Sequence, residues 1–503
     1  MTTAEAAPSA SLPATAPAPR TGPVIALLVA AAFVVILNET IMSVALPRLM
    51  ADLDITAATA QWLTTGFMLT MAVVIPLTGW ALERFNIRAV FFTAMGLFAA
   101  GTLIAALAPG FEILLAGRII QAGGTAIMMP LLFTTVLNVV PPTHRGRMMG
   151  VISIVIAVAP AIGPTVSGVI LSALDWRWMF WIVLPIAVLA IVLGAIWVKN
   201  VTVPKRVRFD VISVVFSALA FGGLIYGLAS IGEAATGHAP IPVWIPIVVG
   251  ALALVAFVLR QLFLQRQDRA LLDLRTFTSR SFSLAVVLVV VAMGAMFGTL
   301  VLLPIYLQQV LGLSTLETGL MLLPGGVLMG VIAPVVGSLF DRFGPRPLVI
   351  PGMVVAAAAL WGMTTFGVET PVWWIIAVHL ALNLGLGFVF TPLLTSALGS
   401  LPRPLYPHGS AIVGTVQQLA GAAGTALFVT MMSLGLASGL EGGVDAVEAT
   451  ASGIHSAFLT GAIIALGAVV LACFVRRPAA DASDDSAASD DSDASDEQPI
   501  LAH

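Results

Sequence analysis

Charged residues are scarce in this chain. Aspartate, glutamate, lysine and arginine make up 9% of its 503 residues, whereas they make up about 25% of a typical soluble domain. Hydrophobic residues make up 59%, and the mean hydropathy is +1.05. No water-soluble packing of this length could bury so much apolar surface. The composition therefore excludes a soluble globular protein and indicates an integral membrane protein.

Cysteine is almost absent as well. The single Cys473 excludes an intrachain disulfide and any paired-cysteine metal or redox site. The sequence also lacks a phosphate-binding glycine loop, an HExxH motif and a GxSxG motif. No cofactor, metal site, catalytic residue or nucleic-acid partner is therefore predicted. Only two basic residues are lysines, an arginine bias that is typical of GC-rich bacterial genomes.

Fourteen apolar runs lie between residues 24 and 475, each long enough to cross about 30 Å of hydrocarbon. The basic residues test this count, because cytoplasmic loops are enriched in them. If the N-terminus is cytoplasmic, 19 of the 22 basic residues fall in inside segments, Arg48 and Arg177 fall outside, and Arg118 lies within a span. The sequence thus predicts an all-α membrane protein with fourteen transmembrane helices and both termini in the cytoplasm.

A repeat divides these spans into two halves. GWALERFNIR (Gly79–Arg88) returns as GSLFDRFGPR (Gly337–Arg346), and the Pro-Leu-Leu at 130–132 returns at 392–394. Such repeats are typical of secondary transporters. The two loop copies follow spans two and ten, so an inserted helix pair separates two halves of six helices. The expected parts are a disordered cytoplasmic N-terminus (1–22), a first half (23–199), the inserted pair with its linkers (200–280), a second half (281–476) and an acidic, disordered cytoplasmic tail (477–503).

Further motifs follow in chain order: LNETIMSVALP (Leu37–Pro47), Arg118 with Gln121, and APAIGPTVSG (Ala159–Gly168). Together with the loop motif, they resemble the fourteen-span drug:proton antiporter branch of the major facilitator superfamily over residues 24–476. Within that branch, Asn38-Glu39-Thr40 resembles the lincomycin-resistance-type multidrug exporters. The resemblance implies the fold of that superfamily with pseudo-symmetric halves, and proton-coupled drug export from a bacterial cell. It marks a loop motif (Gly79, Glu83, Arg84, Arg88, Gly337, Asp341, Arg342 and Arg346) and an antiporter motif (Pro160, Gly163, Pro164, Ser167 and Gly168).

Glu39 and Arg118 are the sharpest chemical features, because ionisable groups at membrane depth are costly and usually functional. Counted along their helices, both lie at a similar depth in the outer half of the membrane. We expect both to face a central cavity and to interact, directly or through water, with Glu39 as the proton-coupling carboxylate. The alternative is a static pair that holds spans one and four together.

The two loop copies are expected to form a mechanical latch. Asp341 ends span ten, so it is placed to accept hydrogen bonds from the exposed N–H groups of the next helix. Glu83 and Asn86 replace the usual aspartate and glycine, which predicts a weaker latch in the first half. Simple anchoring by positive charge is the alternative for both copies. In the antiporter motif, small residues beside proline predict a tight, kinked seam, with generic helix packing as the alternative.

Other polar residues at membrane depth are candidates for the cavity wall, or for ordinary interhelical hydrogen bonds. They are Asn38, Gln121, Gln308, Gln309, His379, Asn383, Gln417 and Gln418.

The predicted function is a proton-coupled exporter of apolar, cationic or amphipathic compounds. It would work by alternating access in the cell membrane, with the proton motive force as the energy source. The expected partners are the lipid bilayer, small-molecule substrates and protons. A dedicated exporter of one endogenous metabolite, lipid or siderophore is the alternative, and a membrane enzyme or receptor is a remote one. Sodium coupling and any oligomeric state are equally compatible with the sequence.

Overall fold

The computed structural model describes residues 21–55, 57–198, 200, 204, 209–235 and 241–475. Within them, every regular element is a helix, so the prediction of an all-α fold is confirmed. Of the N-terminus predicted to be disordered, residues 21 and 22 begin the first helix and the others lie outside the described residues. The acidic tail 477–503 and the basic stretch 205–208 lie outside them as well.

The long helices fall into three groups along the chain. The first is α1 (Thr21–Leu53), α2 (Ala57–Arg84), α3 (Ile87–Ala106), α4 (Phe111–Val139), α5 (Arg145–Ala173) and α6 (Trp178–Trp197). The inserted pair is α7 (Val211–Ala235) and α8 (Trp244–Leu264). The last is α9 (Arg280–Ile305), α10 (Thr315–Phe343), α11 (Arg346–Met363), α12 (Val372–Gly399), α13 (Tyr406–Glu441) and α14 (Ala446–Ala472).

Among the described residues, thirteen of these helices are long and apolar enough to cross a membrane. Helix α5, which contains several side chains outside the described residues, is not one of the thirteen. Helices suit this setting because each satisfies its own backbone hydrogen bonds within the hydrocarbon. The count of fourteen spans therefore stays a prediction.

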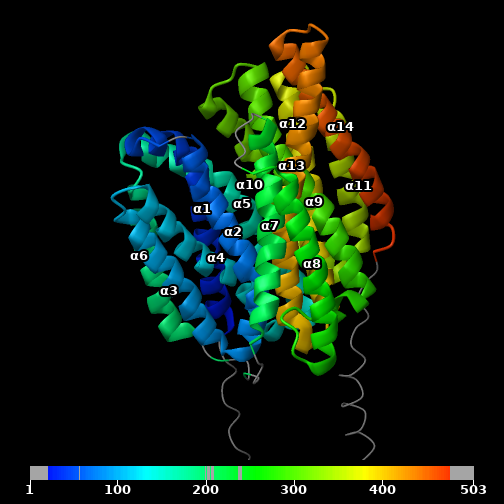
Figure 1. Cartoon of the computed structure of the whole chain (residues 1–503). Coiled ribbons are helices and arrows are strands. Elements are labelled where there is room, and N and C mark those ends of the chain that lie inside the picture. Colours follow the sequence, from blue (N-terminus) through cyan, green and yellow to red (C-terminus); the bar gives the residue numbers. More distant parts are fainter. Residues whose placement is uncertain are drawn as a thin grey trace, which may run out of the picture.

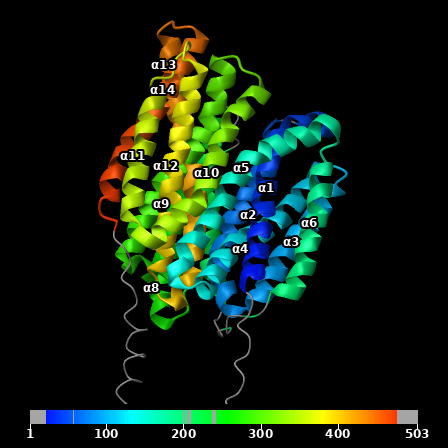
Figure 2. The ribbon, with the colours of Figure 1, turned by 180° about the vertical axis from the view of Figure 1, so that it is seen from behind.

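The two six-helix groups form separate bundles that meet along a few helices (Figures 1 and 2). The main contact joins α5 with α10, and α2 with α13 forms a second. The two proline repeats occupy matching places, with Pro130 inside α4 and Pro392 inside α12. In both views the bundles lie close together at the lower end and farther apart at the upper end.

The inserted pair lies across the two bundles. Helix α7 contacts both α2 and α13, while α8 packs on α7 (Figure 1). The outer surface of the pair is apolar, as expected for a surface that faces lipid, since side chains such as Leu219, Leu252 and Leu259 are exposed. Trp62 of α2 stacks on Tyr226 of α7, with 6.0 Å between ring centroids. The insert therefore bridges the halves instead of hanging beside one of them.

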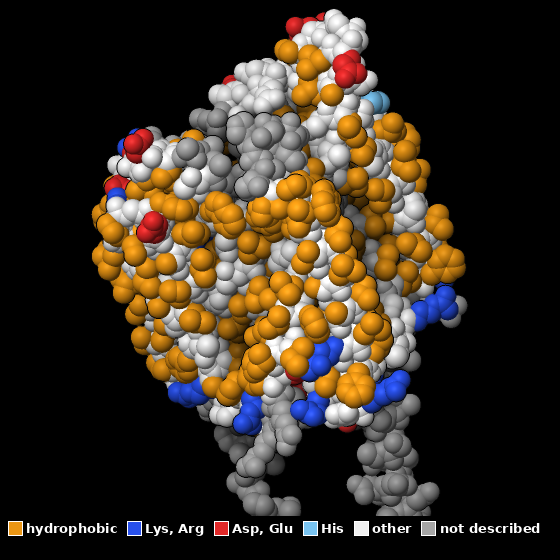
Figure 3. All heavy atoms as spheres, viewed as in Figure 1, with side chains coloured by type: hydrophobic (Ala, Val, Ile, Leu, Met, Phe, Trp, Pro, Cys, Tyr) orange, Lys and Arg blue, Asp and Glu red, His pale blue; other side chains and the backbone are white. Residues whose placement is uncertain are grey.

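Figure 3 shows a wide belt of hydrophobic side chains, with lysine and arginine gathered mainly at the lower end and most acidic side chains at the upper end. This asymmetry matches the enrichment of basic residues on the cytoplasmic side of membrane proteins. We call the lower end, where α2 and α10 finish and α5 and α13 begin, the basic end.

Candidate functional site

A cavity of about 150 Å³ lies between the two bundles, with walls from α1, α2, α4, α5, α9 and α13. Its lining is mostly apolar and rich in methionine (Met71, Met128, Met129, Met293 and Met296). Methionine is flexible and polarisable, so such walls adapt to differently shaped apolar guests. The polar residues of the lining are Glu39, Thr40, Thr125, Gln417 and Gln418.

Glu39 is the one acidic residue among the described residues that line this cavity. Its neighbour Asn38 points elsewhere, because successive helical residues are turned by about 100°. Asn38 is 2% exposed and accepts a hydrogen bond from Arg118 Nη1 at 3.2 Å. Helix α1 thus presents the carboxylate to the cavity and an amide to the arginine behind it.

Arg118 lies behind the cavity wall and is not part of its lining. The side chain is 1% exposed, and Nη1 also donates to Gln121 Oε1 at 2.7 Å. Its guanidinium carbon lies 4.1 Å from the centroid of the Phe67 ring, a cation–π distance. The carboxylate of Glu39 lies near enough for the two charges to interact. Within the described residues, however, the hydrogen bonds of the guanidinium go to amide oxygens instead of a carboxylate.

Close packing of α3 on α4 fixes this arginine. Gln121 is fully buried and donates to Thr102 Oγ1 at 2.7 Å, and Thr102 donates to the Phe98 carbonyl at 2.6 Å. A Cβ at Gly101 would collide with the backbone of Gln121, so only glycine allows the approach. Since its partners are all held by packed helices, Arg118 is a stationary positive charge beside the cavity.

The antiporter motif lies on α5, facing α1. Pro160 lines the cavity, and a Cβ on Gly163 would collide with Thr40 of α1. Ser167 is buried and donates to Met179 Sδ at 3.6 Å. Gly168 is exposed, with nothing within 4 Å of where its Cβ would be. The side chain of Pro164 lies outside the described residues.

This contrast within one motif yields a prediction. Gly163→Val would force α5 away from α1 beside Glu39, whereas Gly168→Val would point into open space. Overpacking of this kind costs about 1–3 kcal/mol, so we expect Gly163→Val to lower transport at least about fivefold. Initial rates in vesicles, normalised to the amount of folded protein, provide the measurement. Equal transport rates for the two variants would contradict a role for Gly163 in the close packing of α5 on α1.

The second-half candidates separate into three places. Gln417 and Gln418 line the cavity, and Gln418 Nε2 donates to Met71 Sδ at 3.7 Å. His379 and Asn383 instead pack between α12 and α10, where His379 Nε2 lies 3.3 Å from the Leu322 carbonyl. Gln308 and Gln309 are exposed on the π-helical segment Tyr306–Val310 that ends α9. The structure thus brings only the two α13 glutamines together with Glu39.

At the basic end, Asp341 joins the two halves. Its carboxylate accepts from the backbone N–H groups of Gly146 at 2.7 Å and Arg147 at 2.9 Å. The sequence predicted that this acid would cap the next helix in the chain, which is α11. That detail was wrong: Asp341 caps the first turn of α5, in the other half. A Cβ on Gly337 would collide with the Gly146 carbonyl, so these glycines permit the close approach.

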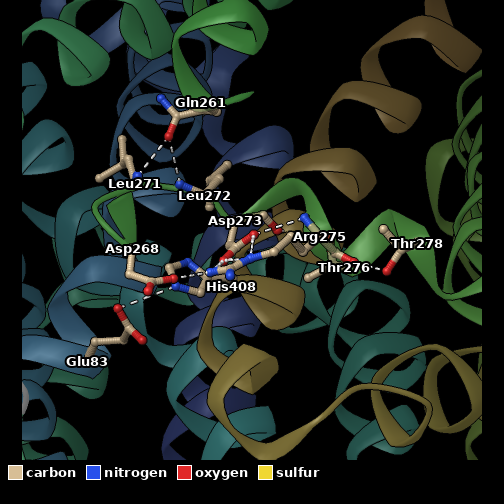
Figure 4. Close-up of polar contacts among 10 residues, drawn as sticks. All are labelled: Glu83, Gln261, Asp268, Leu271, Leu272, Asp273, Arg275, Thr276, Thr278 and His408. Atoms are coloured by element: carbon tan, nitrogen blue, oxygen red, sulfur yellow. Dashed lines mark hydrogen bonds and ion pairs between the residues drawn. The ribbon is translucent and has the colours of Figure 1, made fainter. Parts of the chain in front are cut away.

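The first-half copy makes an equivalent contact with a different donor. Glu83 Oε2 lies 3.4 Å from Nε2 of His408, which is buried in the first turn of α13 (Figure 4). Gly79, the counterpart of Gly337, packs against this histidine, with its Cβ position 3.3 Å from Nδ1. Sequence reasoning missed His408. The 262-residue offset that relates Pro130 to Pro392 also relates Gly146 to His408, and was the available signal.

The arginines of the loop motif differ from one another. Arg88 donates to the carbonyls of Ala195 at 3.0 Å and Val198 at 3.3 Å, which fixes the end of α6. Arg342 lies over the ring of Phe343 at 5.1 Å. Arg84 and Arg346 are exposed.

Further contacts between the halves surround the two acids. Arg145 Nη1 donates to the Tyr406 hydroxyl at 3.1 Å, and Thr391 donates to Ser153 Oγ at 2.8 Å. Thr134 and Ser410 hydroxyls lie 3.0 Å apart. We call these contacts, with those of Asp341 and Glu83, the basic-end lock. They hold the halves together at this end of the molecule.

The linker between α8 and α9 packs against the lock. Gln261 Oε1 accepts from the N–H groups of Leu271 at 2.7 Å and Leu272 at 3.3 Å (Figure 4). The Leu271 carbonyl lies 3.4 Å from the Cβ position of Gly79. Arg260 forms two hydrogen bonds of 2.8 Å with Asp210, and this partner holds the pKa of the Asp210 carboxyl below its usual range. The Arg260–Asp210 pair thus joins α8 to the start of α7, and the hydrogen bonds of Gln261 attach the insert to the linker at the basic end.

Gln261 also yields a stability prediction. Gln261→Leu would leave two buried N–H groups without their acceptor, at a cost of about 1–3 kcal/mol. We expect a lower melting temperature in detergent, whereas Gln267→Leu, at an exposed position of the same linker, should leave it unchanged. A melting temperature that stays at the wild-type value in Gln261→Leu would contradict this role.

The helix order, the repeated loop copies and the cavity between two bundles agree with one family. The sequence profile of the Major Facilitator Superfamily matches residues 28–425. The chain belongs to this superfamily. It is 43% identical over 460 residues to the lincomycin resistance protein LmrB of Listeria monocytogenes, covering 90% of this chain and 97% of that protein. LmrB of Bacillus subtilis is 40% identical over 465 residues, covering 91% and 96%.

Solved structures of the superfamily share the fold. The human organic anion transporter MFSD10 superposes with a TM-score of 0.66 at 15% identity, covering 90% of this chain and all of that one. FucP, in its outward conformation, gives a TM-score of 0.58 at 15% identity, covering 90% and 99%. Family membership and the bacterial relatives therefore indicate a multi-pass bacterial membrane transporter.

Proposed function

We propose that this superfamily member is a drug:proton antiporter that exports apolar cationic or amphipathic compounds across the bacterial inner membrane. The observation that carries the proposal is the position of Glu39, as the acid on an otherwise apolar and methionine-rich cavity wall between the two halves. The names of the two LmrB relatives, which refer to lincomycin resistance, support drug export.

Competition for one carboxylate provides the coupling. A buried acid needs either a proton or a cation to offset its charge, since a lone charge in a low-dielectric site is costly. A bound cationic drug and a proton are therefore alternative partners of Glu39. The stationary charge of Arg118 behind the wall keeps either from binding too tightly for release.

Alternating access supplies the movement. The basic-end lock keeps the halves together on one side, which the positive-inside rule assigns to the cytoplasm. Release of the lock, with closure at the opposite end, would expose Glu39 to the cytoplasm for loading. In this scheme both termini are cytoplasmic, and the predicted halves 23–199 and 281–476 rock about the cavity.

Ethidium efflux tests the proposal directly. Purified protein is reconstituted into liposomes, ethidium is loaded, and its movement is followed by fluorescence under an imposed pH gradient. We expect export that stops when an uncoupler collapses the gradient. Export that continues at the same rate with the uncoupler present would overturn proton antiport, and protein-free liposomes provide the background.

A further inference from the structure

A second cavity, of about 220 Å³, lies beneath the inserted helix α7. Ile225 and Leu228 of α7 form one wall, and residues of α2, α9 and α13 form the others. Phe297 and Gln418 line both this side pocket and the central cavity, so the two spaces adjoin across these side chains. The insert thus contributes directly to the surface that a bound compound would meet.

Size shows why the side pocket matters. A cavity of about 150 Å³ is large enough for benzene, whereas pockets for drug-sized ligands are about 300–1,000 Å³. The central cavity therefore holds a single ring beside Glu39 and little more. The side pocket adds space for a second apolar group, and together the two cavities pass the lower limit for a drug-sized ligand.

The side pocket also offers a polar contact. Thr64 Oγ1 is buried in its wall and has no hydrogen-bond partner among the described residues. An unsatisfied buried hydroxyl is unfavourable, so a guest with a hydrogen-bond donor or acceptor gains binding free energy by pairing with it. Gly421 on α13 keeps room for the neighbouring ring, because a Cβ there would come within 3.1 Å of Phe297.

We propose that the pocket beneath α7 is a second binding subsite, which takes the distal aromatic or apolar group of an elongated substrate whose cationic group lies at Glu39. The inference rests on the proposed function and adds a substrate class to it. Compounds with two separated ring systems, or one extended ring system, use both cavities. Single-ring cations use only the central one.

Occupancy is tested by thiol protection in nanodiscs. The only cysteine, Cys473, is exposed, so Cys473→Ser gives a thiol-free background for the full chain. Ile225→Cys places a thiol in the pocket wall, and Phe209→Cys places one at an exposed position before α7. We expect ethidium to slow modification of the first by methyl methanethiosulfonate at least fivefold and to leave the second unchanged. Equal slowing of modification in both variants, or no slowing in Ile225→Cys, would refute the subsite.

A bulky wall provides the second readout. Ile225→Trp fills the pocket, whereas Leu219→Trp lies on the lipid-exposed side of the same helix. We expect Ile225→Trp to reduce ethidium export at least tenfold while benzyltrimethylammonium export stays within twofold of wild type. An equal loss of export for ethidium and benzyltrimethylammonium would refute the subsite.

Failure of this inference and failure of the proposed function are distinguishable. If the wild type exports ethidium but ethidium does not protect Ile225→Cys, the subsite is wrong and the exporter stands. If Ile225→Cys is protected and no proton-driven export occurs, the subsite stands and the antiporter is wrong. If neither protection nor export occurs, both are wrong.

Discussion

Glu39→Gln should abolish proton-driven ethidium export while the protein remains folded in the membrane. Glutamine has nearly the shape of glutamate, so the cavity wall keeps its packing but loses its charge. The charged contact with a cationic substrate is worth about 1.5–3 kcal/mol, which corresponds to a loss of about 10–150-fold in affinity. The proton also loses its binding group, because the rest of the described cavity lining contains no other acid.

The matched control is Glu112→Gln, in the first turn of α4, where the side chain is exposed and outside the cavity. Export in liposomes and equilibrium binding of ethidium are measured for both variants. We expect Glu112→Gln to match wild type in both assays. Full uncoupler-sensitive export by Glu39→Gln would remove this carboxylate from the coupling mechanism.

Asp341→Asn should shift the protein towards opening at the basic end. The change removes a negative charge from the first turn of α5 and turns an amide group towards N–H donors that need an acceptor. Two charge-assisted hydrogen bonds are weakened, each worth about 1.5–3 kcal/mol, so the population of the open state should rise at least about tenfold.

A thiol within the lock reports the opening. Ser153→Cys in a Cys473→Ser background lies buried beside Thr391, and its alkylation rate measures how often the basic end opens. We expect Asp341→Asn to accelerate alkylation at least tenfold. Asp52→Asn, in an ion pair with Arg48 at the far end of α1, should leave the rate unchanged. An unchanged rate in Asp341→Asn would show that the acid is not part of a latch.

The two loop acids should differ in this assay. Glu83 Oε2 lies 3.4 Å from Nε2 of His408, whereas the hydrogen bonds that Asp341 accepts from the start of α5 are shorter, at 2.7 and 2.9 Å. We therefore expect a smaller acceleration, below about tenfold, for Glu83→Gln. An acceleration by Glu83→Gln equal to or greater than that by Asp341→Asn would contradict the prediction that the second copy is the stronger latch.

Patterns along the chain predicted the fold well, because hydropathy and charge act locally. Apolar runs predict helices, and the repeats at Gly79 and Gly337 predict two equivalent halves. The side on which a residue faces is harder to predict, since helices such as α12 are apolar all round and have no polar stripe to orient them. His379 and Asn383 were expected among the candidates for the cavity, and they pack against α10 instead.

Contacts between the two halves could not be predicted from a single sequence, for a related reason. Asp341 was assigned to the nearest helix start along the chain, whereas the fold brings the start of α5 to it from about 195 residues away. Chain neighbours are a poor guide where two bundles meet. Asn38 and Glu39 illustrate the local case, because helical geometry alone separates their roles once α1 is placed.

The bridging position of α7 has a consequence for the transport cycle. A helix that touches both α2 and α13 cannot stay fixed to both while they rock. The hydrogen bonds that Gln261 of α8 accepts from the N–H groups of Leu271 and Leu272 attach the pair to the linker that leads into α9, so we expect the pair to travel with the second half. The stacked rings of Trp62 and Tyr226 would then slide past each other as α7 moves relative to α2. Each rocking movement would change the shape of the pocket beneath α7, so a compound bound there would lose contact area as the route to the outside opens.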